Sequence, residues 1–228
     1  LIINSDATLK VGGTNTLPSF SGYSVDVNSN VDYAGVATTQ TVANSVNYGN
    51  LIISGTGNKN AYTALTVLGN LTISNGTFNT NTFTVSHSVA GNFIMTGGTI
   101  AGTAATYVLN GSSDQALTLL SNLFKLTINK ASGYVNLGSN ITITNTLNFI
   151  SGKIQTGNYS VIIPSGSTVS GAALNTGWVK GNLKKNVATG TAVSRTFEIG
   201  GATNYLPATV MFGSVSTAGN LTGNVTET

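Results

Sequence analysis

The sequence predicts an all-β protein: a parallel β-solenoid, specifically a right-handed β-helix, followed by a small β-sandwich-like C-terminal element. Three observations support this prediction. Apolar and polar residues alternate in short runs, turn-like positions return every 20 to 22 residues, and a segment of about 76 residues is present twice. Alternation is typical of strands, and a fixed period is typical of a solenoid.

Composition argues against disorder and against helices. Only 7% of the 228 residues are charged, whereas an average soluble domain has about 25%. Disordered chains are poor in β-branched and aromatic residues, which recur here at every second position. Ser, Thr, Asn and Gly are poor residues for a helix interior. The composition therefore indicates an ordered β protein with a surface of hydroxyls and amides.

A short period predicts the turns of the solenoid across residues 1–176. Asn50-Leu51, Asn70-Leu71 and Asn92-Phe93 follow one another at 20 and 22 residues, and "SNGTF" (74–78) returns as "TGGTI" (96–100). A unit of this length buries its apolar face only when stacked on copies of itself. An array of antiparallel β-sandwiches is the alternative, but it explains the period less well. The expected inward positions are Ile3, Val25, Leu51, Ile53, Leu65, Val67, Leu71, Ile73, Phe83, Val85, Phe93, Leu126, Ile128, Ile141, Ile143, Leu147, Phe149, Val161 and Ile163.

The internal duplication of about 76 residues predicts a spacing along the axis. It aligns Leu51 with Leu126 and Leu71 with Leu147. We expect one inward column formed by Leu51, Leu71, Phe93, Leu126 and Leu147, with one rung lengthened by a loop within 101–122. Leu71 and Leu147 would then share a face, three rungs or roughly 14 Å apart. We take that shared face as a test of the solenoid.

From residue 177 to residue 228 the short period is lost. "RTFEI" (195–199) and "ATVMF" (208–212) are predicted to be two strands joined through "GGATNYLP" (200–207). About 50 residues form a marginal core, so we expect a β-sandwich-like cap or the start of a following domain. Trp178 is expected to plug the end of the solenoid rather than to stack on a sugar.

Charge patterning does not favour nucleic acid or membrane partners. Most basic residues are single, and only Lys180, Lys184, Lys185 and Arg195 gather. Nucleic-acid binders cluster basic residues with aromatic ones, so we interpret this group as a solvated strand edge. No apolar segment approaches the 20 or so residues that span a bilayer, so no membrane insertion is expected.

The titratable residues do not predict an enzyme, and no cofactor is expected. Glycoside hydrolysis uses two carboxylates that flank one bond, yet no two acidic residues occupy matching positions on adjacent rungs. His87, the sole histidine, is expected to point outward in "VSHSV" (85–89) as an ordinary surface residue. The acidic residues are Asp6, Asp26, Asp32, Asp114, Glu198 and Glu227.

Two polar strings partly match the patterns of known binding sites. "DVNSNVD" (26–32) has oxygen ligands at alternate positions, but a calcium loop requires Gly at its sixth position and Glu at its twelfth, where Val31 and Ala37 stand. We expect its four polar residues to face outward and no metal to bind. "ITITNT" (141–146) suggests an ice-binding threonine ladder, but this pattern does not recur on every rung.

Four stretches of the sequence carry a resemblance to a known class of proteins: "NYGNLIISGTGNKN" (47–60), "ALTVLGNLTISNGTF" (64–78), their second copy "LFKLTINKASGYVNLGSNITITNTLNFISGKI" (123–154), and "WVKGNLKKNVATGTAVSRTFEIGGATNYLPATV" (178–210). In these stretches the sequence resembles the large repetitive surface proteins of Bacteroidota, many of which are similar to adhesins exported by the type IX secretion route. The resemblance implies secretion, attachment to the bacterial cell surface, and a stalk or adhesive role.

The function expected from these observations is that of a non-catalytic structural module in an extracellular or cell-surface protein, acting as a stalk, a spacer or an adhesin segment. A charge-poor, repetitive shaft extends reach without chemistry. The expected partners are surface polysaccharide, neighbouring repeats of the same long chain, or other copies in a filament. The alternatives are a carbohydrate-binding or polysaccharide-cleaving β-helix and an ice-binding solenoid.

Overall fold

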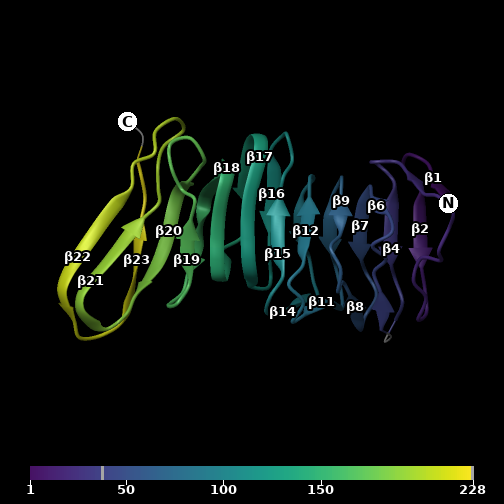
Figure 1. The fold of residues 1–228 in the computed structure, drawn as a ribbon, viewed down its shortest axis with the longest axis horizontal. Coiled ribbons are helices and arrows are strands. Elements are labelled where there is room, and N and C mark those ends of the chain that lie inside the picture. The colour runs from purple at the N-terminus through teal and green to yellow at the C-terminus, as the bar shows by residue number, and fades with distance from the viewer. Residues whose placement is uncertain (37–38, 227–228) are drawn as a thin grey trace.

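The protein is an elongated parallel β-solenoid. The computed structural model describes residues 1–36 and 39–226. Over these residues the chain forms strands and no helix, and it winds through about nine turns with a small C-terminal sheet at one end (Figure 1). The predicted fold class is confirmed. Within the described ranges there is also no helix long and apolar enough to cross a membrane.

Each turn has up to three strands, and we call its sides A, B and C in chain order. Strands of the same side stack in parallel from turn to turn. Side A contains β2 (Thr8–Val11), β4 (Asn30–Tyr33), β7 (Asn50–Ile53), β10 (Leu71–Ile73), β13 (Phe93–Met95) and β16 (Gln115–Thr118). Side B contains β5 (Gln40–Thr41), β8 (Asn58–Asn60), β11 (Thr77–Asn81) and β14 (Thr99–Gly102). Side C contains β6 (Asn47–Tyr48), β9 (Thr66–Val67), β12 (Ser86–Val89) and β15 (Thr106–Leu109).

Later strands are longer and turn the corners themselves. In β17 (Leu123–Leu137), Leu126 pairs with Tyr107 on side C, while Leu137 pairs with Leu117 on side A. In β18 (Ile141–Ile163) the chain likewise runs around the turn, and it also pairs with β19 (Thr168–Ser170). At the other end, the short strands β1 (Ile2–Ile3) and β3 (Ser24–Val25) pair in parallel.

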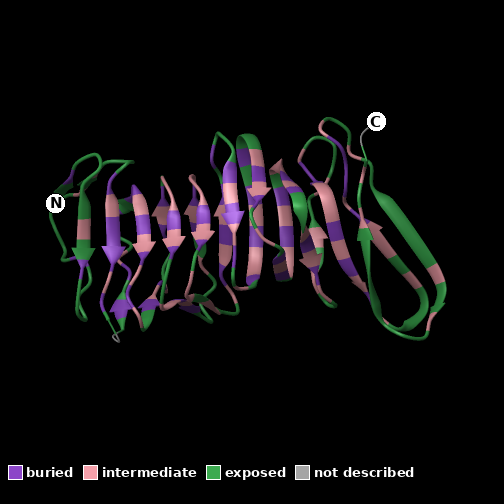
Figure 2. Ribbon diagram, turned by 180° about the vertical axis from the view of Figure 1, so that it is seen from behind, coloured by how far each residue is buried: buried purple, intermediate pink, exposed green. Residues whose placement is uncertain are grey.

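Inward side chains form columns that run along the axis. On side A the column passes through Val31, Leu51, Leu71, Phe93 and Leu117, which are paired rung to rung and buried. Figure 2 shows the resulting alternation of buried and half-buried residues along the strands. Most of the expected inward positions are buried, and Val25 and Val85 are partly buried against the core.

Phe83 is the exception, because its side chain is 44% exposed. It follows the end of β11, where Asn81 has a positive φ of 50°. That left-handed residue breaks the alternation, and the ring of Phe83 packs instead on Tyr62, with the ring centroids 4.8 Å apart. The prediction that Phe83 points inward is wrong.

The expected shared face of Leu71 and Leu147 is also wrong. From Leu71 the side A column passes through Phe93 and Leu117 to Leu137, whereas Leu147 pairs with Leu126 on side C. The two copies of the duplication are therefore offset by three full turns plus two of the three sides of a turn. The predicted shared face requires the duplication to span a whole number of turns. The stacking does not impose this, because each side of a turn offers an inward strand position. The interval between Phe93 and Leu126 is accordingly not one lengthened rung.

Glycines and asparagines close the corners, as the short period suggested. Gly76 and Gly98 have φ of 63° and 67°, and a Cβ on Gly76 would lie 2.3 Å from the carbonyl oxygen of Gly55. Only glycine accepts that approach and that φ without strain. Before each side A strand, an asparagine ladder links the turns: the backbone N–H of Asn70 donates to Asn50 Oδ1, and that of Asn92 donates to Asn70 Oδ1, both at 2.8 Å.

Lys59 and Lys130 are buried in the solenoid, each beside a glutamine at a corner. Lys59 Nζ donates to the carbonyl oxygens of Gly35 at 3.0 Å and Thr56 at 2.6 Å. Lys130 Nζ donates to the carbonyl oxygen of Gly111 at 3.2 Å and to Gln115 Oε1 at 2.9 Å. Burial lowers the pKa of both lysines below its usual value. The carbonyl oxygens satisfy the ammonium groups, as buried charge requires.

The solenoid ends in an antiparallel strand. The parallel rungs continue past residue 176, since β20 (Val179–Val187) pairs in parallel with β18. Then β23 (Gly219–Gly223) pairs antiparallel with β20 and ends the parallel ladder. Between them, β21 (Gly190–Phe197) and β22 (Ala208–Val215) form an antiparallel hairpin with Phe197 opposite Ala208, close to the two predicted strands. Much of this hairpin is exposed (Figure 2).

Replacement of a single column residue should distinguish the two faces of a strand. We expect Leu71→Asp to destabilise the protein by about 5 kcal/mol, because it places an unpaired charge among buried side chains. Thr72→Asp, its outward neighbour on β10, should cost less than about 1 kcal/mol. Urea denaturation of both variants measures the difference. Equal losses would mean that inward and outward positions are exchanged.

Candidate functional site

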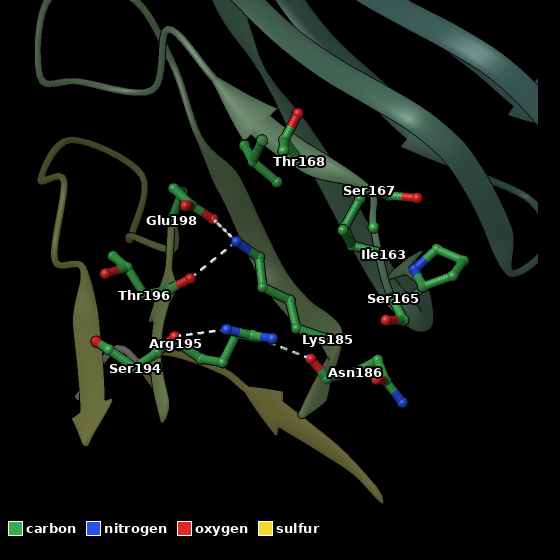
Figure 3. A pocket seen from close by; sticks show the side chains of 13 residues that line it. Ile163, Ser165, Ser167, Thr168, Lys185, Asn186, Ser194, Arg195, Thr196 and Glu198 are labelled. Atoms are coloured by element: carbon green, nitrogen blue, oxygen red, sulfur yellow. Dashed lines mark hydrogen bonds and ion pairs between the residues drawn. The ribbon is translucent and has the colours of Figure 1, made fainter. Parts of the chain in front are cut away.

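A pocket lined by polar and charged residues lies where the last rungs of the solenoid meet the C-terminal hairpin. It has a volume of about 380 Å³ and is shown in Figure 3. One wall is the end of β18 with the following loop and the start of β19, and the other is formed by β20, β21 and Glu198, which follows β21. We call this the junction pocket. Its lining comprises 163–169, 185–186, 194–196 and Glu198.

An ion pair lies within the second wall of the junction pocket, where it joins β20 to the residue that follows β21. Lys185 Nζ on β20 lies 2.6 Å from Glu198 Oε2, and it also donates to the carbonyl oxygen of Thr196 at 2.8 Å. The two side chains are only 8% and 14% exposed. The predicted solvated strand edge is therefore wrong for Lys185, because the alternation of β20 turns it toward the hairpin. Lys180 is also engaged, lying 5.4 Å from the ring centroid of Tyr134.

Arg195 crosses from β21 to β20 beside this ion pair. Its Nε donates to the carbonyl oxygen of Asn186 at 3.0 Å, and its Nη1 donates to that of Ser194 at 2.7 Å. These two bonds fix the plane of the guanidinium, which Figure 3 shows between the two strands. Within 1–36 and 39–226, no hydrogen bond is made by Nη2. The pocket thus combines one neutralised pair with one remaining positive group.

The other described carboxylates lie away from the junction pocket. Asp6 is exposed near the N-terminal end, Asp32 accepts a hydrogen bond from Ser54 Oγ at 2.6 Å, and Glu227 lies outside the described residues. Asp114 is exposed, and hydrogen bonds from the backbone N–H of Tyr134 and from Asn136 hold its pKa below the usual value. Glu198 is paired with Lys185, so the pocket does not offer the two carboxylates of a glycosidase.

The polar string of residues 26–32 divides between a turn and a strand. Asp26 Oδ1 accepts the backbone N–H of Asn28 at 2.8 Å within a turn, whereas Asn30 and Asp32 belong to β4. The expectation that all four polar residues alternate along one strand is wrong. Across the described part of the chain, no three His, Asp or Glu side chains lie close enough to hold a metal ion. Ala37, the twelfth position of the string, lies outside that part.

His87 is buried, and the expectation that it points outward is wrong. Its side chain is 1% exposed and packs on side C against the rings of Tyr107 and Phe78, with centroids 5.5 and 5.6 Å away. Neither ring nitrogen has a hydrogen-bond partner among the described residues. The signal was present in the sequence, because Val85, His87 and Val89 stand at alternate positions and so share one face. Burial lowers the pKa of His87 to about 4.

His87 should make the stability depend on acidity. Because its folded-state pKa lies below the ordinary value of about 6.5, the unfolded chain takes up the proton first. The contribution of neutral His87 to the free energy of unfolding is fully present above pH 6.5, and about 3 kcal/mol of it is lost as the pH falls to about 4. We expect His87→Leu to flatten the profile of unfolding free energy between those values. Parallel profiles for the two proteins would contradict a buried neutral imidazole.

Trp178 is buried outside the inward column. Val179 is buried and pairs with Ile154, which is buried as well. Trp178, the neighbour of Val179, therefore lies on the opposite face of the strand, on the outer side of the rung. There, Trp178 Nε1 donates to the carbonyl oxygen of Gly201 at 2.9 Å, and Lys153 Nζ lies 4.4 Å from the ring centroid. The ring anchors the segment between β21 and β22 to the solenoid. It does not plug the column, and it does not line the junction pocket.

The ion pair of the junction pocket should hold the hairpin in place. Lys185→Met leaves Glu198 without its partner, and we expect a loss of about 3 kcal/mol in unfolding free energy at pH 7. Lys184→Met is the matched control, because Lys184 alternates to the opposite side and should cost less than about 1 kcal/mol. Urea denaturation of both variants gives the comparison. Indistinguishable midpoints would show that the pair contributes nothing.

Comparison with protein-family models, with curated proteins and with solved structures finds no match for this chain. The functional conclusion therefore depends on the sequence, on the fold and on the chemistry of the described residues.

Proposed function

We propose that the chain is a non-catalytic structural module of an extracellular or cell-surface protein, acting as a stalk, a spacer or an adhesin segment. The observation that carries this proposal is the unbroken stacking of about nine turns in the described residues, each joined to the next by paired strands. A solenoid of this kind spans distance in proportion to its number of turns. Its outer surface is covered mainly by uncharged polar side chains.

The sequence resemblance supports a location at the surface of Bacteroidota-type bacteria. Repetitive surface proteins are built from such charge-poor, repeated segments, and 7% charged residues fits that composition. The partners proposed on this basis are surface polysaccharide, neighbouring repeats of the same chain, or other copies in a filament.

Carbohydrate binding is the second candidate, favoured by one observation: the junction pocket has a polar lining and a positive group. Cleavage of polysaccharide has less support, because Glu198 forms an ion pair with Lys185. Ice binding has little support as well. The hydroxyl pairs Thr77–Thr99 and Thr146–Thr168 link adjacent rungs, but they lie on sides B and C respectively and do not form one array.

Labelling of intact cells tests the proposed location and role. Antibodies against the chain should label intact cells that produce it, and brief protease treatment of those cells should remove the label. Labelling that requires permeabilised cells would contradict a surface module. Release of reducing or unsaturated sugar ends from acidic or neutral polysaccharides by the purified chain would contradict the non-catalytic role, and thermal hysteresis would favour ice binding instead.

A further inference from the structure

We propose that the junction pocket binds a carboxylated sugar unit of an acidic polysaccharide, with Arg195 contacting the carboxylate. This deepens the adhesive role proposed above and rests on it for the source of the ligand. The pocket volume of about 380 Å³ falls in the range of small-molecule sites, which begins at about 300 Å³. One or two sugar units would occupy such a space.

The charges in the pocket select an anion. Lys185 and Glu198 neutralise each other at 2.6 Å, so the net positive charge belongs to Arg195, the only arginine of the chain. A planar guanidinium matches the geometry of a carboxylate, whereas an ammonium group acts as a point charge. The bonds from Nε and Nη1 to backbone carbonyls use two of the five N–H groups, which leaves both N–H groups of Nη2 and one of Nη1 to donate to a ligand.

The position of Arg195 is also set before any ligand arrives. Its two carbonyl partners, Asn186 on β20 and Ser194 on β21, belong to strands that the Lys185–Glu198 pair holds together. A side chain fixed in this way loses little further freedom on binding, which favours affinity. An exposed, flexible lysine lacks this advantage.

The remaining lining suits a hydroxylated ligand. Ser165, Ser167 and Thr196 are among the lining residues that carry hydroxyls. Glu198 Oε1 makes no hydrogen bond within the described ranges, so it can accept one from a sugar hydroxyl. None of the described lining residues is aromatic, so recognition would depend on charge and hydrogen bonds rather than on stacking.

Calorimetric titration of the purified chain tests this site. The probes are short oligomers of galacturonate, glucuronate and mannuronate, each with its methyl ester as the uncharged match, and a sulfated oligomer of similar length. We expect at least one uronate oligomer to bind with a Kd below 1 mM, and its methyl ester to bind at least about tenfold more weakly, given the value of a charged hydrogen bond. Arg195→Gln should weaken binding by a similar factor.

Two further variants keep the test decisive. Lys10→Gln removes an exposed positive charge on β2, far from the pocket, and should bind as the unaltered chain does. Ser165→Leu fills the pocket while Arg195 stays in place, and should also weaken binding, even if Arg195→Gln loosens the hairpin. Any of four results would overturn the assignment. These are no binding of any uronate, binding of the methyl esters as tight as that of the acids, equal losses of affinity for Lys10→Gln and Arg195→Gln, and tighter binding of the sulfated oligomer. None of these results would alter the labelling of intact cells.

Discussion

The stacking of each rung on the next is the constraint on which the rest of the structure depends. A parallel rung presents its inward side chain directly above that of the preceding rung, as Leu51, Leu71 and Phe93 do on side A. Each such side chain contributes roughly 1.5–3 kcal/mol on burial, and one misplaced charge would interrupt the column. The corners must be equally close, which is why Gly76 approaches the backbone of Gly55. An antiparallel strand, β23, ends the ladder and covers its last parallel edge.

The stacking also explains why Gln and Lys side chains are buried at corners of an otherwise apolar interior. Gln40 and Gln115, which the internal duplication aligns, accept hydrogen bonds from the backbone N–H groups of Gly35 and Gly111 respectively. A buried lysine then satisfies the carbonyl oxygens that these corners leave without partners. Because the duplication spans three turns and two sides, the two copies of this arrangement occupy different corners of the solenoid. The arrangement of a buried Gln with a buried Lys can therefore form at more than one corner of the turn.

Much of the fold could be predicted from the sequence, because its two signals are local. Alternation identifies strands, and the return of Asn before Leu or Phe identifies turns, so the solenoid and most inward positions were correct. The side on which each strand lies was not predictable from spacing alone. The number of residues between two strands does not show how many corners the chain turns between them. Phe83 was misplaced because a left-handed Asn81 reverses the alternation locally. The junction pocket was missed because Lys185, Arg195 and Glu198 meet only through the return of the hairpin.

Disulfide mapping of the stacking tests the central claim most directly, because the chain has no cysteine of its own. Thr72 pairs with Ile94 on side A, and Thr127 pairs with Asn148 on side C. Adjacent strands lie about 4.8 Å apart, within the span of a disulfide. The double variants Thr72→Cys/Ile94→Cys and Thr127→Cys/Asn148→Cys should each form an intramolecular disulfide under mild oxidation, and Thr72→Cys/Asn148→Cys should not. Failure of the first two pairs, or efficient cross-linking of the third, would contradict the solenoid described here.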